Sequence, residues 1–262
     1  MMRAMWSAAA GMSVQQLNMD TISNNLANVN TTGFKKARAE FQDLLYQTVN
    51  LAGTSSSTNT TLPAGIQLGH GAKLQSVVHQ YSTGNFRTTG GRFDMGIEGD
   101  GFFRVTMPDG TQAYTRDGSF AVDQNGALVT ASGYAMDPQI TIPQDATSVT
   151  IAQDGTVSVT QPAQSQPQQV GQITLVKFIN PTGLNQIGRN LVTTTLASGE
   201  PIEGTPGLDG LGTLQQGFLE MSNVDVADEM VNMIIGQRAY EANSKTIRTV
   251  DDMLSLVANL KR

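Results

Sequence analysis

The sequence predicts an α+β protein with a discontinuous α-helical coiled-coil domain made from both termini, a central, mostly antiparallel β domain and an extended arm. Three observations support this fold class. Apolar residues recur at steps of three and four near both ends, turn dipeptides separate short alternating runs in the middle, and a Thr-, Ser- and Gly-rich segment lies between. We expect the terminal helical assembly domain at 1–35 and 223–262, the arm at 36–71, and the β domain at 72–222.

The first thirty residues carry a heptad pattern, which predicts a long helix. A helix of about 26 residues would be about 39 Å long. Arg3 and Asp20 are its only charges, so the helix is poorly suited to standing alone in water. Turn-forming residues up to Gly33 then end it. We expect the seam of this helix to be a subunit interface, formed by Met5, Ala8, Met12, Met19, Ile22, Leu26 and Val29.

A second helix is predicted at the C-terminus. Asp225 and Asp228 are placed to cap its first turn and to favour the positive end of its dipole. The apolar steps of three and four contain one slip that resembles a stammer. The seam positions expected at the interface are Met230, Met233, Tyr240, Ile247 and Leu254.

The middle of the chain predicts short antiparallel strands. Asp109-Gly110, Asn125-Gly126 and Asp154-Gly155 are dipeptides typical of hairpins, and Asp100-Gly101 and Asp117-Gly118 are similar. Two helices at opposite ends of such a β body can pair with each other and with neighbouring copies. The alternative is an ordinary α+β domain in which both helices pack on their own β body, and periodicity alone does not decide between the two.

Composition argues against several classes of function. The formal net charge is -6, which gives no basic surface for nucleic acid, and charged residues are only 15% of the chain, which suits close packing of identical copies. There is no cysteine, and no stretch approaches the roughly 18 apolar residues of a membrane span. Glu98 and Asp100 are better explained as turn residues than as a catalytic pair, and two histidines do not make a metal site. We therefore predict no catalytic, cofactor-binding or metal-binding residues.

The run from Ser23 to Lys35 closely resembles the N-terminal signature of bacterial flagellar rod and hook proteins. Two further regions extend the resemblance over nearly the whole chain. They are Glu98–Phe103 with Tyr114–Phe120, and Gly217–Glu220 with Ser222–Asp225 and Gln237–Asn243. The signature positions are Asn24, Asn25, Asn28, Asn30, Thr32, Gly33 and Phe34.

This resemblance implies a structural protein rather than an enzyme. Family members of this kind form a hollow helical tube, with the terminal helices inside and the β domain outside, which carries motor torque to the hook. The implied location is the periplasmic part of the basal body, reached through the flagellar type III export apparatus without a cleavable signal peptide. The implied partners are further copies of the chain, the proximal rod proteins, the hook protein and the surrounding rings.

Within the family, the length and the segment from Pro63 to Gly71 resemble the members that build the distal part of the rod. The arm residues that carry this likeness are Pro63, Gly65, Gln67 and Gly69. A proximal rod or hook subunit is the alternative. A periplasmic carbohydrate-acting enzyme is a more remote one, because it would need two carboxylates about 5 to 9.5 Å apart in a cleft.

Overall fold

The computed structural model describes residues 2–51, 55–57, 60–61, 63–162 and 166–259. The chain divides into two compact units. The helical unit contains Met1–Leu26, Ala37–Val78 and Asp225–Arg262, and the β unit contains Ala27–Lys36 and His79–Val224. Helices at both ends and an antiparallel β body confirm the predicted α+β class.

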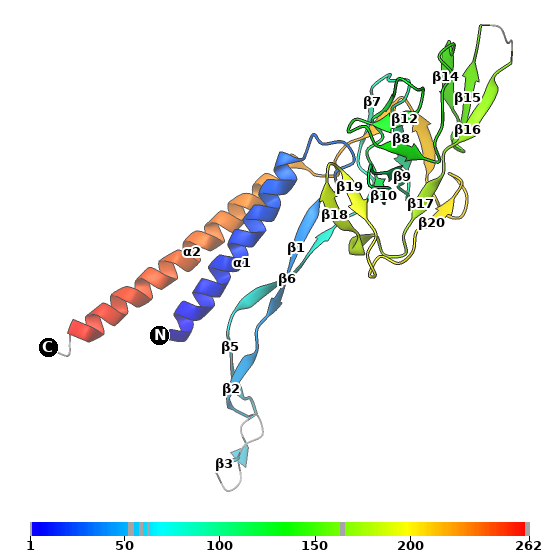
Figure 1. The fold of residues 1–262 in the computed structure, drawn as a ribbon. Coiled ribbons are helices and arrows are strands. Elements are labelled where there is room, and N and C mark those ends of the chain that lie inside the picture. Colours follow the sequence, from blue (N-terminus) through cyan, green and yellow to red (C-terminus); the bar gives the residue numbers. More distant parts are fainter. Residues whose placement is uncertain (1, 52–54, 58–59, 62, 163–165, 260–262) are drawn as a thin grey trace. The chain divides into compact units, whose positions relative to one another are not determined.

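Two long antiparallel helices form one side of the helical unit, α1 (Met2–Ala27) and α2 (Val226–Asn259). They run side by side (Figure 1), with Gly11 facing Asn243 and Gly236 facing Met19. The first turn of α2 is capped by Asp225, whose Oδ1 accepts a hydrogen bond from the Ala227 amide at 2.8 Å. The small side chain of glycine allows this close approach of the two helices.

The rest of the helical unit is a series of two-stranded antiparallel ribbons. The first pairs β1 (Ala37–Asp43) with β6 (Ala72–His79), and the second continues it by pairing β2 (Tyr46–Asn50) with β5 (Ile66–Gly69) (Figure 1). A short pair, β3 (Ser55–Ser57) with β4 (Thr60–Thr61), follows. The segment predicted as an extended arm is therefore mostly strand, although residues 52–54, 58–59 and 62 lie outside the described part of the chain.

The β unit is built around a seven-stranded antiparallel sheet with the order β11-β12-β13-β9-β10-β19-β18. A three-stranded sheet, β14-β15-β16, and three strand pairs, β17 with β20, β8 with β21 and β7 with β22, complete it. One continuous core joins the larger sheet to the smaller one through residues such as Phe103, Leu128, Met136 and Val157. The strand bounds are β7 (Phe86–Thr88), β8 (Met95–Glu98), β9 (Phe103–Thr106), β10 (Gln112–Thr115), β11 (Phe120–Val122), β12 (Leu128–Thr130), β13 (Ala135–Asp137), β14 (Ser148–Ile151), β15 (Thr156–Thr160), β16 (Gln168–Gln172), β17 (Leu175–Lys177), β18 (Asn185–Gly188), β19 (Leu191–Thr193), β20 (Ile202–Gly204), β21 (Thr213–Gln216) and β22 (Phe218–Glu220), with a short 3-10 helix at Pro181–Gly183.

The turn dipeptides have two different roles. Asp109-Gly110, Asn125-Gly126 and Asp154-Gly155 connect strands that pair with each other, as hairpin turns do. Asp117-Gly118 instead joins β10 to β11, which are not neighbours in the sheet. A Cβ on Gly118 would lie 1.5 Å from the carbonyl oxygen of Met95, so this glycine permits close contact with β8.

Replacing Gly33 with alanine tests the path of the chain after α1. Gly33 has φ +67°, and a Cβ would lie 2.6 Å from the backbone nitrogen of Asp117. We expect Gly33→Ala to lower the free energy of unfolding by about 3 kcal/mol, because left-handed strain adds to a clash with backbone atoms. Gly110→Ala is the matched control, since Gly110 has φ +80° with nothing within 4 Å, and should cost only about 1 kcal/mol. Urea unfolding followed by circular dichroism measures both, and equal losses would contradict the close packing at Gly33.

Candidate assembly surface

The predicted seam of α1 is covered within the chain itself. Ala8 and Ile22 are buried, and Met5, Met12, Met19 and Leu26 are partly buried. The cover comes from α2, through Gly236, and from the ribbon, since Gly71 lies against Ala10. Val29 lies in the turn that follows α1 and is also partly buried.

The buried face of α2 is displaced from part of the predicted seam. Met233 and Ile247 lie on it and are partly buried, whereas Met230, Tyr240 and Leu254 are 53%, 38% and 36% exposed. The fully buried residues of α2 are instead Glu229, Gly236 and Val250. Glu229 and Gly236 lie at heptad spacing from Met233 and Ile247, but neither is apolar enough to be recognised as part of an apolar repeat.

Asn25 joins three elements of the helical unit. Its Nδ2 donates to the Ala37 carbonyl at 2.8 Å and to Glu229 Oε2 at 3.2 Å, while its Oδ1 accepts from the Ala37 amide at 2.9 Å. The side chain is buried, as is that of Glu229. One amide therefore links α1, β1 and α2, which fixes how the helices meet the first strand.

The other signature residues shape the turn after α1. Asn28 Oδ1 accepts from the hydroxyl of Thr31, and the hydroxyl of Thr32 donates to Asp117 at 2.9 Å. The Gly33 amide donates to the Glu220 carbonyl at 2.9 Å. Two further members of the set, Asn24 and Asn30, have exposed side chains, and Phe34 is partly buried.

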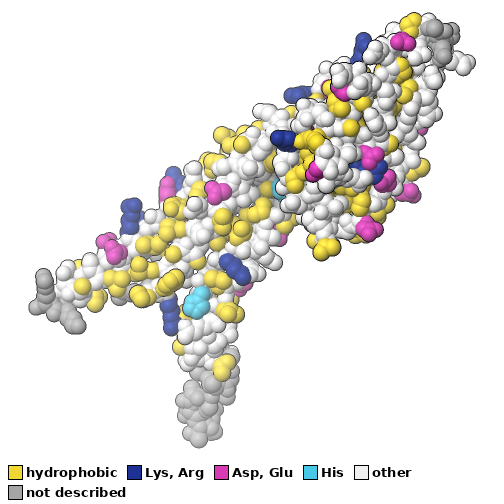
Figure 2. Space-filling model, in the orientation of Figure 1, with side chains coloured by type: hydrophobic (Ala, Val, Ile, Leu, Met, Phe, Trp, Pro, Cys, Tyr) yellow, Lys and Arg dark blue, Asp and Glu magenta, His cyan; other side chains and the backbone are white. Residues whose placement is uncertain are grey.

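The outward face of α2 changes character along its length. Near the start it carries an apolar stripe formed by Met230, Val231, Ile234 and Ile235, each between 53% and 60% exposed. Charged residues from Arg238 to Asp252 follow, and apolar residues return at 253–257. Figure 2 shows hydrophobic side chains spread along the helices on the face in view. Contiguous exposed apolar surface of this kind is typical of a protein–protein interface.

The ribbon of β2 and β5 is exposed on both faces. Every residue in both strands is exposed, including Tyr46, Val49, Ile66 and Leu68. The arm residues Gln67 and Gly69 lie in β5, with the Tyr46 ring over Gly69, while Pro63 and Gly65 precede the strand and are exposed. Because an isolated two-stranded ribbon is only marginally stable in water, this segment is suited to packing against another molecule.

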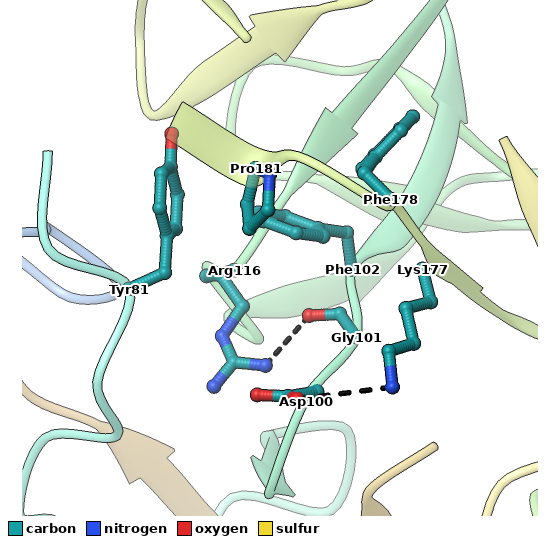
Figure 3. A pocket seen from close by; sticks show the side chains of 8 residues that line it. All are labelled: Tyr81, Asp100, Gly101, Phe102, Arg116, Lys177, Phe178 and Pro181. Atoms are coloured by element: carbon teal, nitrogen blue, oxygen red, sulfur yellow. Dashed lines mark hydrogen bonds and ion pairs between the residues drawn. The ribbon is translucent and has the colours of Figure 1, made fainter. Parts of the chain in front are cut away.

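The carboxylates considered for catalysis are already engaged. Glu98 Oε2 accepts from Gln215, and Asp100 lies 3.9 Å from the ammonium of Lys177. Asp100 and Lys177 lie at a hollow of about 60 Å³ walled by Tyr81, Phe102, Phe178 and Pro181, which Figure 3 shows from close by. Glu98 does not line this hollow, so the two carboxylates do not face each other across it. Tyr81, on the wall of the hollow, is largely buried, and this burial raises its pKa to about 12. Among the described residues no group of acidic or histidine side chains could hold a metal ion.

Three buried charges form an ionic cluster that reaches this hollow through Arg116, which also lines it. Lys35 Nζ lies 2.6 Å from Glu220 Oε1, and Arg116 Nε lies 3.0 Å from Glu220 Oε2. Glu220 Oε1 also accepts from the Gly84 amide at 2.9 Å. Burial lowers the pKa of Lys35, the positive charge of Arg116 lowers it further, and Glu220 opposes both effects. Sequence reasoning assigned no role to these residues, since nothing in their spacing shows that they meet.

Three family profiles match separate parts of the chain. The one described as "Flagella basal body rod protein" matches residues 5–35, "Flagellar hook protein FlgE/F/G D1 domain" matches 96–159, and "Flagellar basal body rod FlgEFG protein C-terminal" matches 215–260. A protein of Borreliella burgdorferi named flagellar basal-body rod protein FlgG is 54% identical over 264 residues, covering 100% of both chains. The chain belongs to the flagellar basal-body rod protein family.

Two other relatives with the same name support this membership of the rod protein family. The one from Buchnera aphidicola subsp. Schizaphis graminum is 54% identical, and the one from Caulobacter vibrioides is 48% identical. Each match covers 99% of this chain and 100% of the relative. Lys35, Arg116 and Glu220 come from the three different matched segments, so the ionic cluster joins all three parts of a rod protein.

No helix in the described part of the chain is long and apolar enough to cross a membrane.

Replacing Asn25 tests the link between the helices and β1. We expect Asn25→Ala to lower the free energy of unfolding of the helical unit by about 2–3 kcal/mol, because the Ala37 amide and carbonyl lose their buried partner. Asn30→Ala, at an exposed signature position, should change it by less than about 0.5 kcal/mol. Thermal unfolding followed by helical circular dichroism makes the comparison. Similar effects at both positions would show that Asn25 does not organise the unit.

Replacing Glu220 tests the ionic cluster. Glu220→Gln keeps the shape of the side chain but leaves the charges of Lys35 and Arg116 buried without a counter-ion, so we expect a loss of about 3–5 kcal/mol. Glu241→Gln is the control, because its pair with Arg238 is exposed and contributes little. Urea midpoints of the purified full chain measure both. A Glu220→Gln protein as stable as the control would contradict the cluster's structural role.

Proposed function

We propose that this protein is a structural subunit of the distal rod of the bacterial flagellar basal body, which polymerises into a rigid, hollow drive shaft and transmits motor torque to the hook. The observation that carries the proposal is the exposed apolar stripe of α2 at Met230, Val231, Ile234 and Ile235. Relatives named as basal-body rod proteins, similar over their whole length, support it.

The size of the stripe favours a polymer over a single pairwise contact. Fully burying an apolar side chain yields about 1.5–3 kcal/mol, and these four are only 53–60% exposed, so completing their burial would give about 3–7 kcal/mol. Association costs about 4–15 kcal/mol in lost freedom, so one contact of this kind is marginal alone. A subunit in a tube meets several neighbours at once, which adds further contacts to each subunit.

The chain offers a second, different apolar surface for the stripe to meet. Met2, Trp6 and Leu17 on α1 are 69%, 71% and 39% exposed. Contact between unlike surfaces of identical copies is heterologous, and it produces an open helical assembly when the rotation does not close. We infer that the seam positions covered within the chain, such as Met233 and Ile247, hold the helix pair, while Met230, Tyr240 and Leu254 face neighbouring copies.

The exposed ribbon of β2 and β5 supplies the proposed arm. Its apolar side chains on both faces suit a position wedged between neighbouring subunits, where they would be buried on assembly. An arm of this kind would oppose sliding between subunits and so favour a straight rod over a bending hook. Its residues Pro63, Gly65, Gln67 and Gly69 belong to this contact.

The remaining assignments follow from the rod function. We infer that the chain acts in the periplasmic part of the basal body, after passage through the type III export apparatus. Proximal rod proteins and the hook protein would adjoin the two ends of the polymer, and the basal-body rings would surround it. The role is mechanical, and no enzymatic activity is assigned.

A double substitution in the stripe tests the assembly surface. We expect Ile234→Asp with Ile235→Asp to leave the subunit folded but to prevent filament formation and motility. Assembly would then have to bury two carboxylates in an apolar interface, which is costly. Circular dichroism, light scattering at rising protein concentration and complementation of a non-motile strain lacking the chain measure these effects. Leu196→Asp is the matched control at an exposed apolar residue of the β unit. Normal filaments from the double variant would overturn this surface.

A further inference from the structure

The polypeptide crosses between the two units repeatedly. From the division of the chain, the crossings follow Leu26, Lys36, Val78 and Val224. Any force that reaches the β unit through the chain therefore enters by these connections. A connection transmits such a force only if it is held in place, because a flexible linker rich in Gly and Ser would extend and rotate instead.

Three of these connections lead into segments of the β unit that are bonded to one another through Asn223. Its Oδ1 accepts from the Lys36 amide at 2.8 Å. Its Nδ2 donates to the Gln80 carbonyl and to Ser82 Oγ, both at 2.9 Å. One side chain thus links the segment that leaves for β1, the segment that follows β6 and the segment that leads into α2.

Backbone and charged groups reinforce the same place. The Gln80 amide donates to the Lys36 carbonyl at 2.8 Å, and the ammonium of Lys35 donates to the Ser82 carbonyl at 2.7 Å while pairing with Glu220. The crossing after Leu26 leads into the turn that ends at Gly33, whose amide donates to the Glu220 carbonyl. We call the set formed by Lys35, Lys36, Gln80, Ser82, Glu220 and Asn223 the junction.

The bonds of the junction are arranged to share a load. They run between three different chain segments, so a pull on any one segment is resisted by bonds to the other two at the same time. Lys35 and Glu220 are also buried, which shields their pair from competition by water. Local opening of the junction would require several such bonds to break together, which makes it a rare event.

We propose that the junction is a torque-transmitting element, which fixes the chain connections to one another inside the β unit so that twist is shared among them instead of unravelling one strand. This inference rests on the proposed rod function. Asn223 is the residue that positions the three segments, because its side-chain amide accepts a hydrogen bond from one segment and donates hydrogen bonds to another. Asn223 Nδ2 also lies 3.3 Å from the Ser82 carbonyl oxygen. A carboxylate in its place could still accept from Lys36 but would face the carbonyl oxygens of Gln80 and Ser82 without a proton to donate.

Asn223→Asp opens the junction with almost no change in side-chain size. In the purified full chain we expect amide hydrogen exchange at Gln80, whose carbonyl would face the new carboxylate, to become about tenfold faster or more. Asn185→Asp adds the same charge at an exposed strand position of the β unit and should leave this exchange unchanged. Ser82→Ala removes only one acceptor and should give an intermediate effect.

The decisive measurement is torque in cells that carry each variant. Electron microscopy of basal bodies establishes that rods and hooks have assembled, and rotation of flagella carrying beads of increasing size measures torque against load. We expect Asn223→Asp to match the wild type at low load and to lose at least about half of the torque at high load. We expect a smaller loss for Ser82→Ala and none for Asn185→Asp.

The results separate this inference from the function on which it rests. Full torque at high load in Asn223→Asp and Ser82→Ala cells with assembled hooks would overturn the junction's role and leave the rod function intact. Unchanged exchange at Gln80 would overturn the role of Asn223. Normal hook assembly in a strain that lacks the whole chain would instead overturn the rod function.

Discussion

The carboxylate of Glu220 brings distant parts of the sequence to one point. It pairs with Lys35 near the N-terminus and with Arg116 in the centre of the β body, both buried, and accepts from the partly buried Gly84 amide. Removing such charges from water is costly, and the cost is offset only when every partner is in place. Lys35 follows α1 and Glu220 precedes α2 along the chain, so the cluster holds together the segments that lead to the two terminal helices.

The helices show a second constraint, which is that a helix pair buries only one face of each member. Contacts at Gly11 and Gly236 allow α1 and α2 to approach closely, and Asn25 ties both to the first strand. The opposite face of α2 keeps its apolar residues in water. An assembling subunit needs such a surface, and the low content of charged residues reduces repulsion between copies.

Several ionisable side chains of the β unit are held in structural contacts. Glu98 and Asp100 are bonded to neighbours in the β body, and Arg116 is held by the carbonyls of Gly99 and Gly101 as well as by Glu220. The hollow beside them has aromatic walls and carries one carboxylate on its lining, so it lacks the pair that glycoside hydrolysis requires. The surfaces of the helical unit that are suited to contact other molecules are the apolar stripe of α2 and the ribbon of β2 and β5.

The sequence by itself determined the element types and the family, because heptad spacing, turn dipeptides and the signature from Ser23 to Lys35 are local properties of the chain. Only the tertiary structure decided which face of α2 turns inward and which charges meet. Met230 and Met233 both fit an apolar repeat, yet Met233 lies on the buried face and Met230 on the exposed one. The physical reason is that a helical period defines stripes along a helix, whereas the choice between stripes depends on what packs against them. Lys35, Arg116 and Glu220 likewise meet only because the fold closes, since their contact depends on long-range packing rather than on spacing along the chain.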